Sequence, residues 1–170
     1  MGLSPPELLE AHHAIESFQS GEPSLDAWLT RRSRANQASG ATRTYVVCHG
    51  NRVVAYYALA SGVVAAAAAP GRFRRNMPDP IPVAVLARLA VDAEWQGQGL
   101  GRALLRDAVN RIAQAAHLIG IRGIVVHAIS DAVREFYITL GFTPSPSEPM
   151  LLMVTLADIR AGLSLDDRTR

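Results

Sequence analysis

Apolar positions recur with two different periods along this chain, and the changes of period mark the expected elements. Apolar runs of strand length stand at residues 42–48, 53–61, 83–91, 123–128 and 150–156, which predicts strands there. Over residues 100–119 the apolar positions are instead spaced by three, four and seven, which is typical of one helical face. The residues expected to be buried on that face are Leu105, Ala108, Val109, Ile112, Ala116 and Ile119.

Turn and cap residues place the remaining elements. Ser24 is a good N-cap for a helix over residues 25–38 that buries Trp28, and Gly50-Asn51 joins the first two long strands as a hairpin. Ser130 is expected to cap a short helix that carries Phe136 and Tyr137. Prolines deny regular structure to residues 70–82. Residues 1–10 are read as an exposed lead-in, with a first strand and turn around residues 12–18.

The strands over residues 83–91 and 123–128, joined by the long helix, predict a right-handed βαβ unit with a parallel pair. The 170 residues suit one domain with a substantial core. No internal repeat or low-complexity linker interrupts them. We therefore predict a single mixed α/β domain over residues 1–163 and a polar, frayed tail over residues 164–170.

Composition narrows the class of protein. Hydrophobic residues make up 49% of the chain and the formal charge is only +2, which indicates a globular protein. The apolar run over residues 55–69 is alanine-rich and interrupted by tyrosines, so we expect buried strand and loop and no membrane span. A single cysteine, Cys48, excludes an internal disulfide and suits the reducing cytoplasm. Arginines cluster at Arg31, Arg32 and Arg34 and again at Arg72, Arg74 and Arg75.

The segment between the third long strand and the long helix carries alternating glycines, Gly97, Gly99 and Gly101. Glycine permits positive φ and close approach of backbone N–H groups, and the helix dipole adds positive potential, so the segment predicts a phosphate or pyrophosphate site. A Walker loop is excluded because the chain has no lysine. The dinucleotide fingerprint is excluded because the last glycine comes one residue too early.

The loop matches Gln/Arg-x-x-Gly-x-Gly/Ala, with Gln96, Gly99 and Gly101, and Phe136-Tyr137-x-x-x-Gly141-Phe142 is a second local signature. Together they resemble the GNAT superfamily of N-acetyltransferases. The wider segment over residues 86–101, and residues 21–29 near the N-terminus, resemble the toxin branch of bacterial toxin–antitoxin systems, which acetylates aminoacyl-tRNA. Ala87 departs from that branch, where glycine is expected.

The resemblance implies a mostly antiparallel central sheet with a splayed parallel pair and flanking helices. It also implies acetyl-CoA as co-substrate, with its pantetheine on the strand at Leu89, Ala90 and Val91. The pyrophosphate would bind the loop and helix start, made of Gln96, Gly97, Gln98, Gly99, Gly101 and Arg102.

By the same resemblance, Tyr137 lies near the thioester sulfur, where a phenol suits the general acid that protonates the leaving thiolate. The alternative is a packed tyrosine bonded to backbone. No general base stands out, since the spacing singles out neither Asp92 nor Glu94. An α-amino group is partly neutral near pH 7, so the lack of a base favours an α-amine acceptor over lysine or a polyamine.

The arginines also favour an acceptor that carries phosphate. Arg72, Arg74 and Arg75, with Phe73 among them, and Arg88 are the candidate tRNA contacts. A solvated basic loop is the alternative for the first group. The adjacent His12 and His13 point to opposite faces of a strand, and no cysteine or carboxylate cluster completes a ligand set, so no metal site is expected.

The resemblance further implies a homodimer and a ribbon-helix-helix antitoxin partner. Two rival functions remain: acetylation of a protein N-terminus or small amine, and non-catalytic binding of CoA or nucleic acid. Which amino acid or tRNA is modified does not follow from the sequence.

Overall fold

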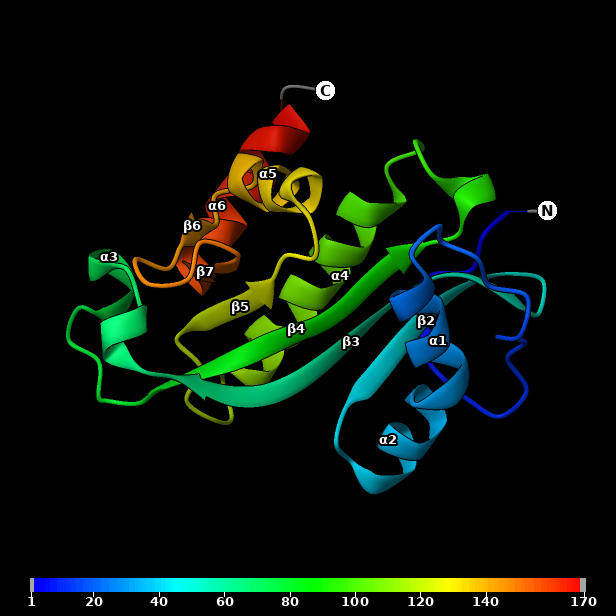
Figure 1. The fold of residues 1–170 in the computed structure, drawn as a ribbon, viewed down its shortest axis with the longest axis horizontal. Helices are drawn as coiled ribbons and strands as arrows, with labels where there is room; N and C mark the ends of the chain where they lie inside the picture. The colour runs from blue at the N-terminus through cyan, green and yellow to red at the C-terminus, as the bar shows by residue number, and fades with distance from the viewer. Residues whose placement is uncertain (1, 169–170) are drawn as a thin grey trace. The chain divides into compact units, whose positions relative to one another are not determined.

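The computed structural model describes residues 2–168, with side chains up to residue 164. Its strands are β1 (Glu7–Leu8), β2 (Arg43–His49), β3 (Arg52–Val64), β4 (Ile81–Val91), β5 (Gly123–His127), β6 (Thr143–Pro144) and β7 (Leu151–Thr155). Its α-helices are α1 (Pro23–Arg31), α2 (Ser33–Ser39), α3 (Gly71–Arg74), α4 (Leu100–Ala115), α5 (Asp131–Thr139) and α6 (Leu156–Arg168). Short 3₁₀ turns occupy η1 (Ala66–Ala68) and η2 (Ala93–Trp95). The strands form a seven-stranded sheet in the order β1-β2-β3-β4-β5-β7-β6. Figure 1 labels most of these elements on the ribbon.

Contacts within the chain divide it into two compact units, each made of two segments. Unit 1 comprises residues 1–60 and 87–108, and unit 2 comprises residues 61–86 and 109–170. The chain passes from one unit to the other within β3, β4 and α4. The prediction of a single domain over residues 1–163 stays a prediction.

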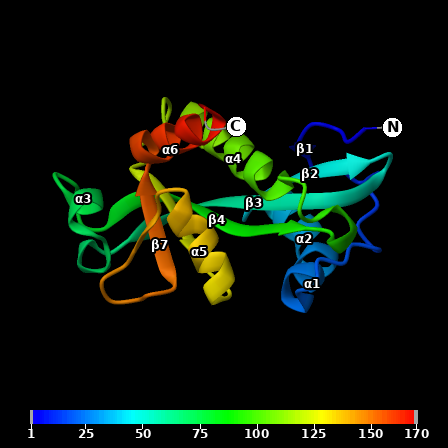
Figure 2. The ribbon, with the colours of Figure 1, turned by 90° about the horizontal axis from the view of Figure 1, so that it is seen from above.

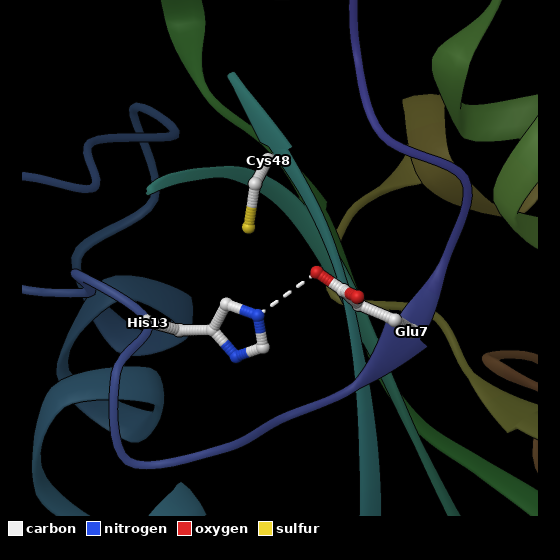
Figure 3. Close-up of side chains that lie close together, drawn as sticks. All are labelled: Glu7, His13 and Cys48. Atoms are coloured by element: carbon white, nitrogen blue, oxygen red, sulfur yellow. Dashed lines mark hydrogen bonds and ion pairs between the residues drawn. The ribbon is translucent and has the colours of Figure 1, made fainter. Parts of the chain in front are cut away.

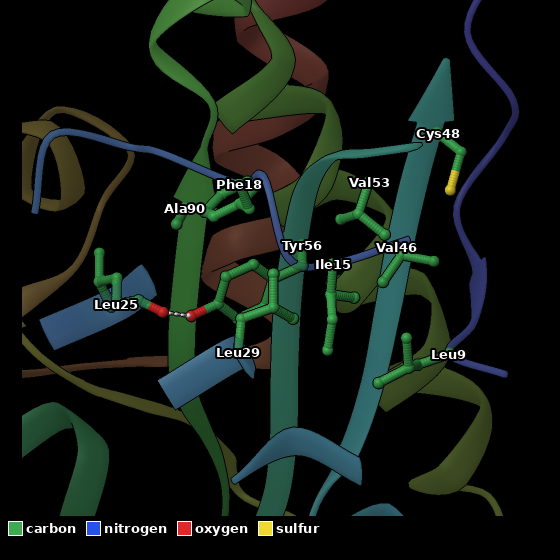
Figure 4. Packing of buried hydrophobic residues seen from close by; sticks show 10 residues of the cluster. All are labelled: Leu9, Ile15, Phe18, Leu25, Leu29, Val46, Cys48, Val53, Tyr56 and Ala90. Atoms are coloured by element: carbon green, nitrogen blue, oxygen red, sulfur yellow. Dashed lines mark hydrogen bonds between the residues drawn. The ribbon is translucent and has the colours of Figure 1, made fainter. Parts of the chain in front are cut away.

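Unit 1 is built on the β2–β3 hairpin, whose strands pair antiparallel, with β1 added antiparallel to β2. Helix α1 buries Leu25 and Leu29 against this hairpin, and the Tyr56 hydroxyl donates to the Leu25 carbonyl oxygen at 2.7 Å (Figure 4). Tyr56 and Tyr57 are both fully buried although they point to opposite faces of β3. The core of the unit consists of Leu9, Ile15, Phe18, Leu25, Leu29, Val46, Cys48, Val53, Tyr56 and Ala90.

Unit 2 contains the parallel pair, in which residues 84–86 of β4 lie beside residues 124–126 of β5. Strand β7 pairs antiparallel with β5 and β6 and contacts the helices α3, α5 and α6 (Figure 2). One core cluster of the unit consists of Val64, Ala69, Phe73, Ile81, Val83, Val125 and Met153.

The structure confirms the mixed α/β class, the mostly antiparallel sheet with one parallel pair, and the hairpin. The predicted cap of α5 is also confirmed, because the Ser130 side chain accepts the Val133 N–H at 3.2 Å. In the part of the chain that the structure describes, no helix is long and apolar enough to cross a membrane.

The helix predicted over residues 25–38 is broken. Arg32 has non-helical dihedrals (φ −121°, ψ −30°) and separates α1 from α2. The next residue, Ser33, donates its hydroxyl back to the Leu29 carbonyl oxygen, and such back-bonding competes with the helical ladder and bends helices. Helix α1 begins earlier than predicted, with Glu22 rather than Ser24 as its N-cap. Trp28 is only partly buried.

The ends of several other elements also differ from the prediction. Helix α4 ends at Ala115, so Ala116 is only partly buried and Ile119 is 59% exposed. The lead-in includes β1, while residues 12 and 13 form a turn rather than a strand. Residues 164–168, predicted as a frayed tail, belong to α6, and residues 169–170 lie outside the described residues. Strand β6 and helix α3 were not predicted because each is too short for a periodic signal.

Gly123 at the start of β5 gives a test of the packing in unit 2. A Cβ at this position would lie 2.0 Å from the Val154 carbonyl oxygen and 2.8 Å from the Phe73 ring. We expect Gly123→Ala to lower the free energy of unfolding by about 3 kcal/mol, because backbone atoms must move. Gly120→Ala is the matched control, since nothing lies within 4 Å of its Cβ position. Urea unfolding of both variants measures the difference, and equal stability would contradict the packing described.

Candidate functional site

The glycine loop lies between η2 and α4 and has the backbone geometry of an anion site. Gly97 and Gly99 have φ angles of 80° and 83°, which only glycine adopts readily. The helical hydrogen-bond ladder opens with the Ala103 N–H donating to the Gly99 carbonyl oxygen at 3.1 Å. Leu100 and Gly101 therefore precede the first ladder donor, at the positive end of a 16-residue helix. This arrangement suits a phosphate or pyrophosphate.

A buried carboxylate fixes the point where β4 turns into this segment. Asp92 is only 2% exposed, and its carboxylate accepts the N–H groups of Gln19 (3.0 Å) and Glu94 (3.1 Å). Arg52 adds a salt bridge at 3.3 Å. Because these donors occupy the carboxylate, we assign Asp92 a structural role and not that of the general base. Its position between strand and loop was visible in the sequence, but its partners 40 and 73 residues away were not.

Gln96, the first residue of the motif, bonds to backbone on both sides of the loop. Its Nε2 donates to the carbonyl oxygens of Ser20 (2.7 Å) and Val91 (2.8 Å). A carboxamide has only two N–H donors, so both are used. In this arrangement Gln96 shapes the loop and leaves anion binding to the backbone. Ser20 is itself held by Asp26 of α1, through its hydroxyl (2.6 Å) and its N–H (2.9 Å).

The other predicted cofactor residues lie around the loop in unit 1. Leu89 and Val91 lie on the opposite face of β4 from Ala90, which is buried against the α1 core. Gln98 is exposed within the loop, and Arg102 is partly buried in the first turn of α4.

Tyr137 lies on α5 in unit 2 and is 3% exposed. Its ring makes edge contacts with Phe136 and Phe142, each at 5.1 Å between centroids. Burial raises the pKa of the Tyr137 phenol well above its ordinary value. Among the described residues, no group accepts the proton of this hydroxyl, in contrast to Tyr56, whose hydroxyl donates to a backbone carbonyl. Within the described part of the chain, Tyr137 therefore lacks the backbone bond that the alternative required, and burial keeps its phenol protonated at neutral pH.

The predicted arginine contacts do not share one environment. Arg72 forms a two-point ion pair with Asp158, at 2.7 and 2.8 Å, and this hydrogen bonding lowers the pKa of the Asp158 carboxyl. Phe73, the aromatic residue of that segment, is 3% exposed and belongs to the core. Arg74 and Arg75 are exposed. Arg88 lies in unit 1, on β4, with its guanidinium carbon 5.4 Å from the centre of the Trp28 ring.

Glu7, His13 and Cys48 meet in unit 1 with their ligand atoms within 4.8 Å of one another (Figure 3). The premise that no cysteine or carboxylate lies beside the histidines was therefore wrong, because Glu7 of β1 and Cys48 of β2 approach His13. The expectation of no metal site stays a prediction. The hydrogen bonds nevertheless oppose a metal. The Glu10 N–H donates to His13 Nδ1 at 2.8 Å, so Nε2 carries the proton, which it donates to Glu7 at 2.9 Å.

A metal would need the lone pair that this proton occupies. Burial, with the charge of Glu7 nearby, also raises the pKa of the Cys48 thiol and keeps it protonated. We interpret the group as a hydrogen-bonded cluster that joins β1 to the turn that follows it.

Comparison with known proteins yields consistent matches. Residues 40–144 match the model of the acetyltransferase (GNAT) domain. A tRNA-acetylating toxin of Mycobacterium tuberculosis is 53% identical over 160 residues, covering 94% of this chain and 96% of the relative. The structure of AtaT complexed with acetyl-methionyl-tRNAfMet is 29% identical and superposes with a TM-score of 0.86, covering 94% of this chain and 98% of the other. A mutant AtaT toxin bound to the C-terminus of the antitoxin AtaR and acetyl-CoA is 27% identical, with a TM-score of 0.80 and coverage of 95% and 97%.

The hydrogen bonds of Gln96 predict which side chain keeps the loop rigid. We expect Gln96→Leu to speed amide hydrogen exchange over residues 97–101 by about fivefold or more, because it removes both bonds to flanking carbonyl groups. Gln98→Leu is the matched control, since Gln98 lies exposed in the same loop. Exchange measured by mass spectrometry should be unchanged in the control; equal exchange in the two variants would contradict the role assigned to Gln96.

Burial of Tyr137 predicts its titration. The unfolded phenol has a pKa of about 10, and burial raises its pKa in the folded state. The contribution of the protonated phenol to folding stability is therefore complete below about pH 10 and is lost as pH rises through the folded pKa. We expect Tyr137→Phe to remove phenolate absorbance from the late, alkaline stage of a titration at 295 nm, the stage that accompanies unfolding. Loss of amplitude from the stage near pH 10 would show that the phenol is solvated.

Proposed function

The chain belongs to the acetyltransferase (GNAT) family, and on that premise we propose that it transfers the acetyl group of acetyl-CoA to the α-amino group of an aminoacyl-tRNA, thereby blocking translation. The observation that supports acetyl-CoA as the co-substrate is the glycine loop, with its positive φ angles, at the start of α4. The observation that favours the acceptor is the 53% identity with a tRNA-acetylating toxin over nearly the whole chain.

We infer that acetyl-CoA binds to elements of unit 1. Its pyrophosphate fits the backbone of Gly97, Gln98, Gly99 and Gly101, with the charge of Arg102 close by in the first turn of α4. Its pantetheine amides suit hydrogen bonds with the strand backbone at Leu89, Ala90 and Val91. Gln96 supports this site by shaping the loop rather than by touching the phosphates.

The reaction requires one bond to form and one to break. The neutral α-amine attacks the thioester carbonyl carbon, the C–N bond forms, the C–S bond breaks, and coenzyme A leaves as a thiolate. We propose that Tyr137 donates the proton that the thiolate takes up, and that the amine releases its extra proton to solvent. A phenol kept protonated by burial, with no acceptor among the described residues, suits this role.

A dedicated base is not needed for this acceptor. An α-amino group has a pKa of about 8, so a useful fraction is neutral at pH 7. Asp92 is engaged by backbone N–H groups and Arg52, which agrees with a reaction that draws on no carboxylate base.

Partners and location follow from the same proposal. Arg72, Arg74, Arg75 and Arg88 are candidate contacts for the tRNA phosphates, although the ion pair with Asp158 already occupies the guanidinium of Arg72. A mutant AtaT toxin binds the C-terminus of its antitoxin AtaR. By analogy we propose an antitoxin of the ribbon-helix-helix class, a homodimeric state and a cytoplasmic location for this chain.

Transfer of labelled acetyl from acetyl-CoA to a mixed pool of charged tRNA tests the function. We expect wild-type protein to form acetyl-aminoacyl-tRNA, and Tyr137→Phe to lower kcat by about 100-fold or more because the general acid is lost. Acetyl-CoA binding, measured by calorimetry, should be unchanged in the variant. Identification of the labelled amino acid names the acceptor.

Other outcomes of the same assay favour the rival functions. Acetylation of peptides or small amines without any charged-tRNA product would contradict the tRNA acceptor and keep the enzyme class. No transfer to any acceptor, with acetyl-CoA still bound, would favour a binding module.

A further inference from the structure

Trp28 and Arg88 form an ordered stack on unit 1. The guanidinium carbon of Arg88 lies 5.4 Å from the centre of the Trp28 ring, and the Trp28 ring stacks on Tyr56 at 5.9 Å with planes only 5° apart. Tyr56 is fully buried and anchored to Leu25 (Figure 4). The Arg88 Nη1 also donates to the Ala87 carbonyl oxygen at 2.7 Å. The guanidinium is therefore held in place from two sides.

Within the described side chains, the Arg88 guanidinium has no carboxylate partner. Among the residues whose side chains are described, no carboxylate pairs with Arg88, Arg31 or Arg32. Arg31, the last residue of α1, lies three residues after Trp28, and Arg32 follows it at the end of the helix; both are exposed. We name Trp28, Arg31, Arg32 and Arg88 the α1 cationic surface.

Neighbouring arginines of unit 1 differ in this respect. Arg34 pairs with Glu16 and donates to the His13 carbonyl oxygen at 2.6 Å. Arg52 pairs with Asp92 and Glu94. Among the residues whose side chains are described, Arg88 on Trp28 and the nearby Arg31 and Arg32 thus have no carboxylate partner, which suits an anionic ligand.

The segment around Arg72, Arg74 and Arg75, which the sequence favoured for RNA contact, lacks an exposed aromatic ring, and one of its arginines is paired with a carboxylate. Its aromatic residue, Phe73, is buried in the core, and Arg72 is bound to Asp158 by two hydrogen bonds. Basic side chains interleaved with an accessible aromatic ring are typical of single-stranded nucleic-acid contacts. In unit 1 the partly exposed Trp28 lies next to Arg88 and close in sequence to the exposed Arg31 and Arg32, although its ring supports the guanidinium and stacks on Tyr56.

We propose that the α1 cationic surface binds the sugar-phosphate backbone at the single-stranded 3′ end of the tRNA acceptor. This inference rests on the proposed function and adds Trp28, Arg31 and Arg32 to the acceptor site. Arg88 contacts phosphate with its fork of N–H donors, and Arg31 and Arg32 contact phosphates farther along the strand. Trp28 is a positioning residue, because its ring holds the guanidinium plane.

Binding of an uncharged tRNA transcript tests the surface without requiring catalysis. We expect Arg88→Ala and Trp28→Leu each to raise Kd by about fivefold or more. Arg88→Lys should recover only part of this loss, because lysine lacks the planar fork, whereas Trp28→Phe should recover most of it. Arg43→Ala is the matched control, since Arg43 is exposed and likewise donates to a backbone carbonyl group, that of Gln37.

Further readouts separate a contact from a fold defect. Removing the phosphate contact of Arg88 should reduce the slope of log Kd against log salt by about 0.7, the value for one phosphate of a single strand. A transcript that lacks the single-stranded 3′ nucleotides should bind wild type and Arg88→Ala equally. Acetyl-CoA affinity should stay unchanged in every variant.

The possible failures can be told apart. If Arg88→Ala and Arg43→Ala weaken tRNA binding equally, only net charge matters and the proposed site is overturned, even where acetyl transfer to tRNA is observed. If the variants weaken binding of a DNA duplex and not of tRNA, the surface serves DNA and the proposal is equally overturned. If tRNA binding follows the expected pattern but no charged tRNA is acetylated, the surface stands and the proposed function fails.

Discussion

The buried carboxylate of Asp92 is the contact on which the organisation of unit 1 depends. It accepts N–H donors from the Gln19 segment and from the turn after β4, and it pairs with Arg52 of β3. A charge that is 2% exposed is tolerated only when its lone pairs are satisfied in this way. The same bonds fix where β4 stops and how the chain enters the glycine loop. The geometry of the proposed anion site, which is made of backbone atoms, is therefore set by a buried side chain next to it.

Gln96 and Ser20 extend this constraint toward α1. Gln96 connects the loop to Ser20, and Ser20 is held by Asp26 in the first turn of α1. The helix that bears Trp28 is consequently joined to the proposed cofactor loop through a short series of hydrogen bonds. In a transferase that must bring an acyl donor and an RNA acceptor together, such a connection would keep the two proposed binding surfaces of unit 1 in a fixed relation.

Local signals were sufficient to predict the features closest to the chemistry. The positive φ angles at Gly97 and Gly99, the strands β4 and β5 and the Ser130 cap are each encoded within a few residues, and the structure contains them. The anion site that the glycine spacing predicts stays a prediction. Contacts between distant residues were not predictable. The bond between Asp92 and Gln19 spans 73 residues and that between Arg72 and Asp158 spans 86. Phe73 is buried by residues of β4, β5 and β7, which are distant in sequence. The composition of the segment around Arg72, Arg74 and Arg75 therefore wrongly favoured an accessible aromatic ring.

The interleaving of the two units has a consequence for how the chain is made. Unit 1 is incomplete until residue 108 has been synthesised, because its glycine loop and the start of α4 come from its second segment. By that stage residues 61–86, which belong to unit 2, have already been synthesised without most of their partners. Domains generally fold from the N-terminus as units during synthesis. Neither unit of this chain corresponds to a continuous stretch of messenger RNA. The ribosome therefore begins to synthesise unit 2 before it has finished unit 1.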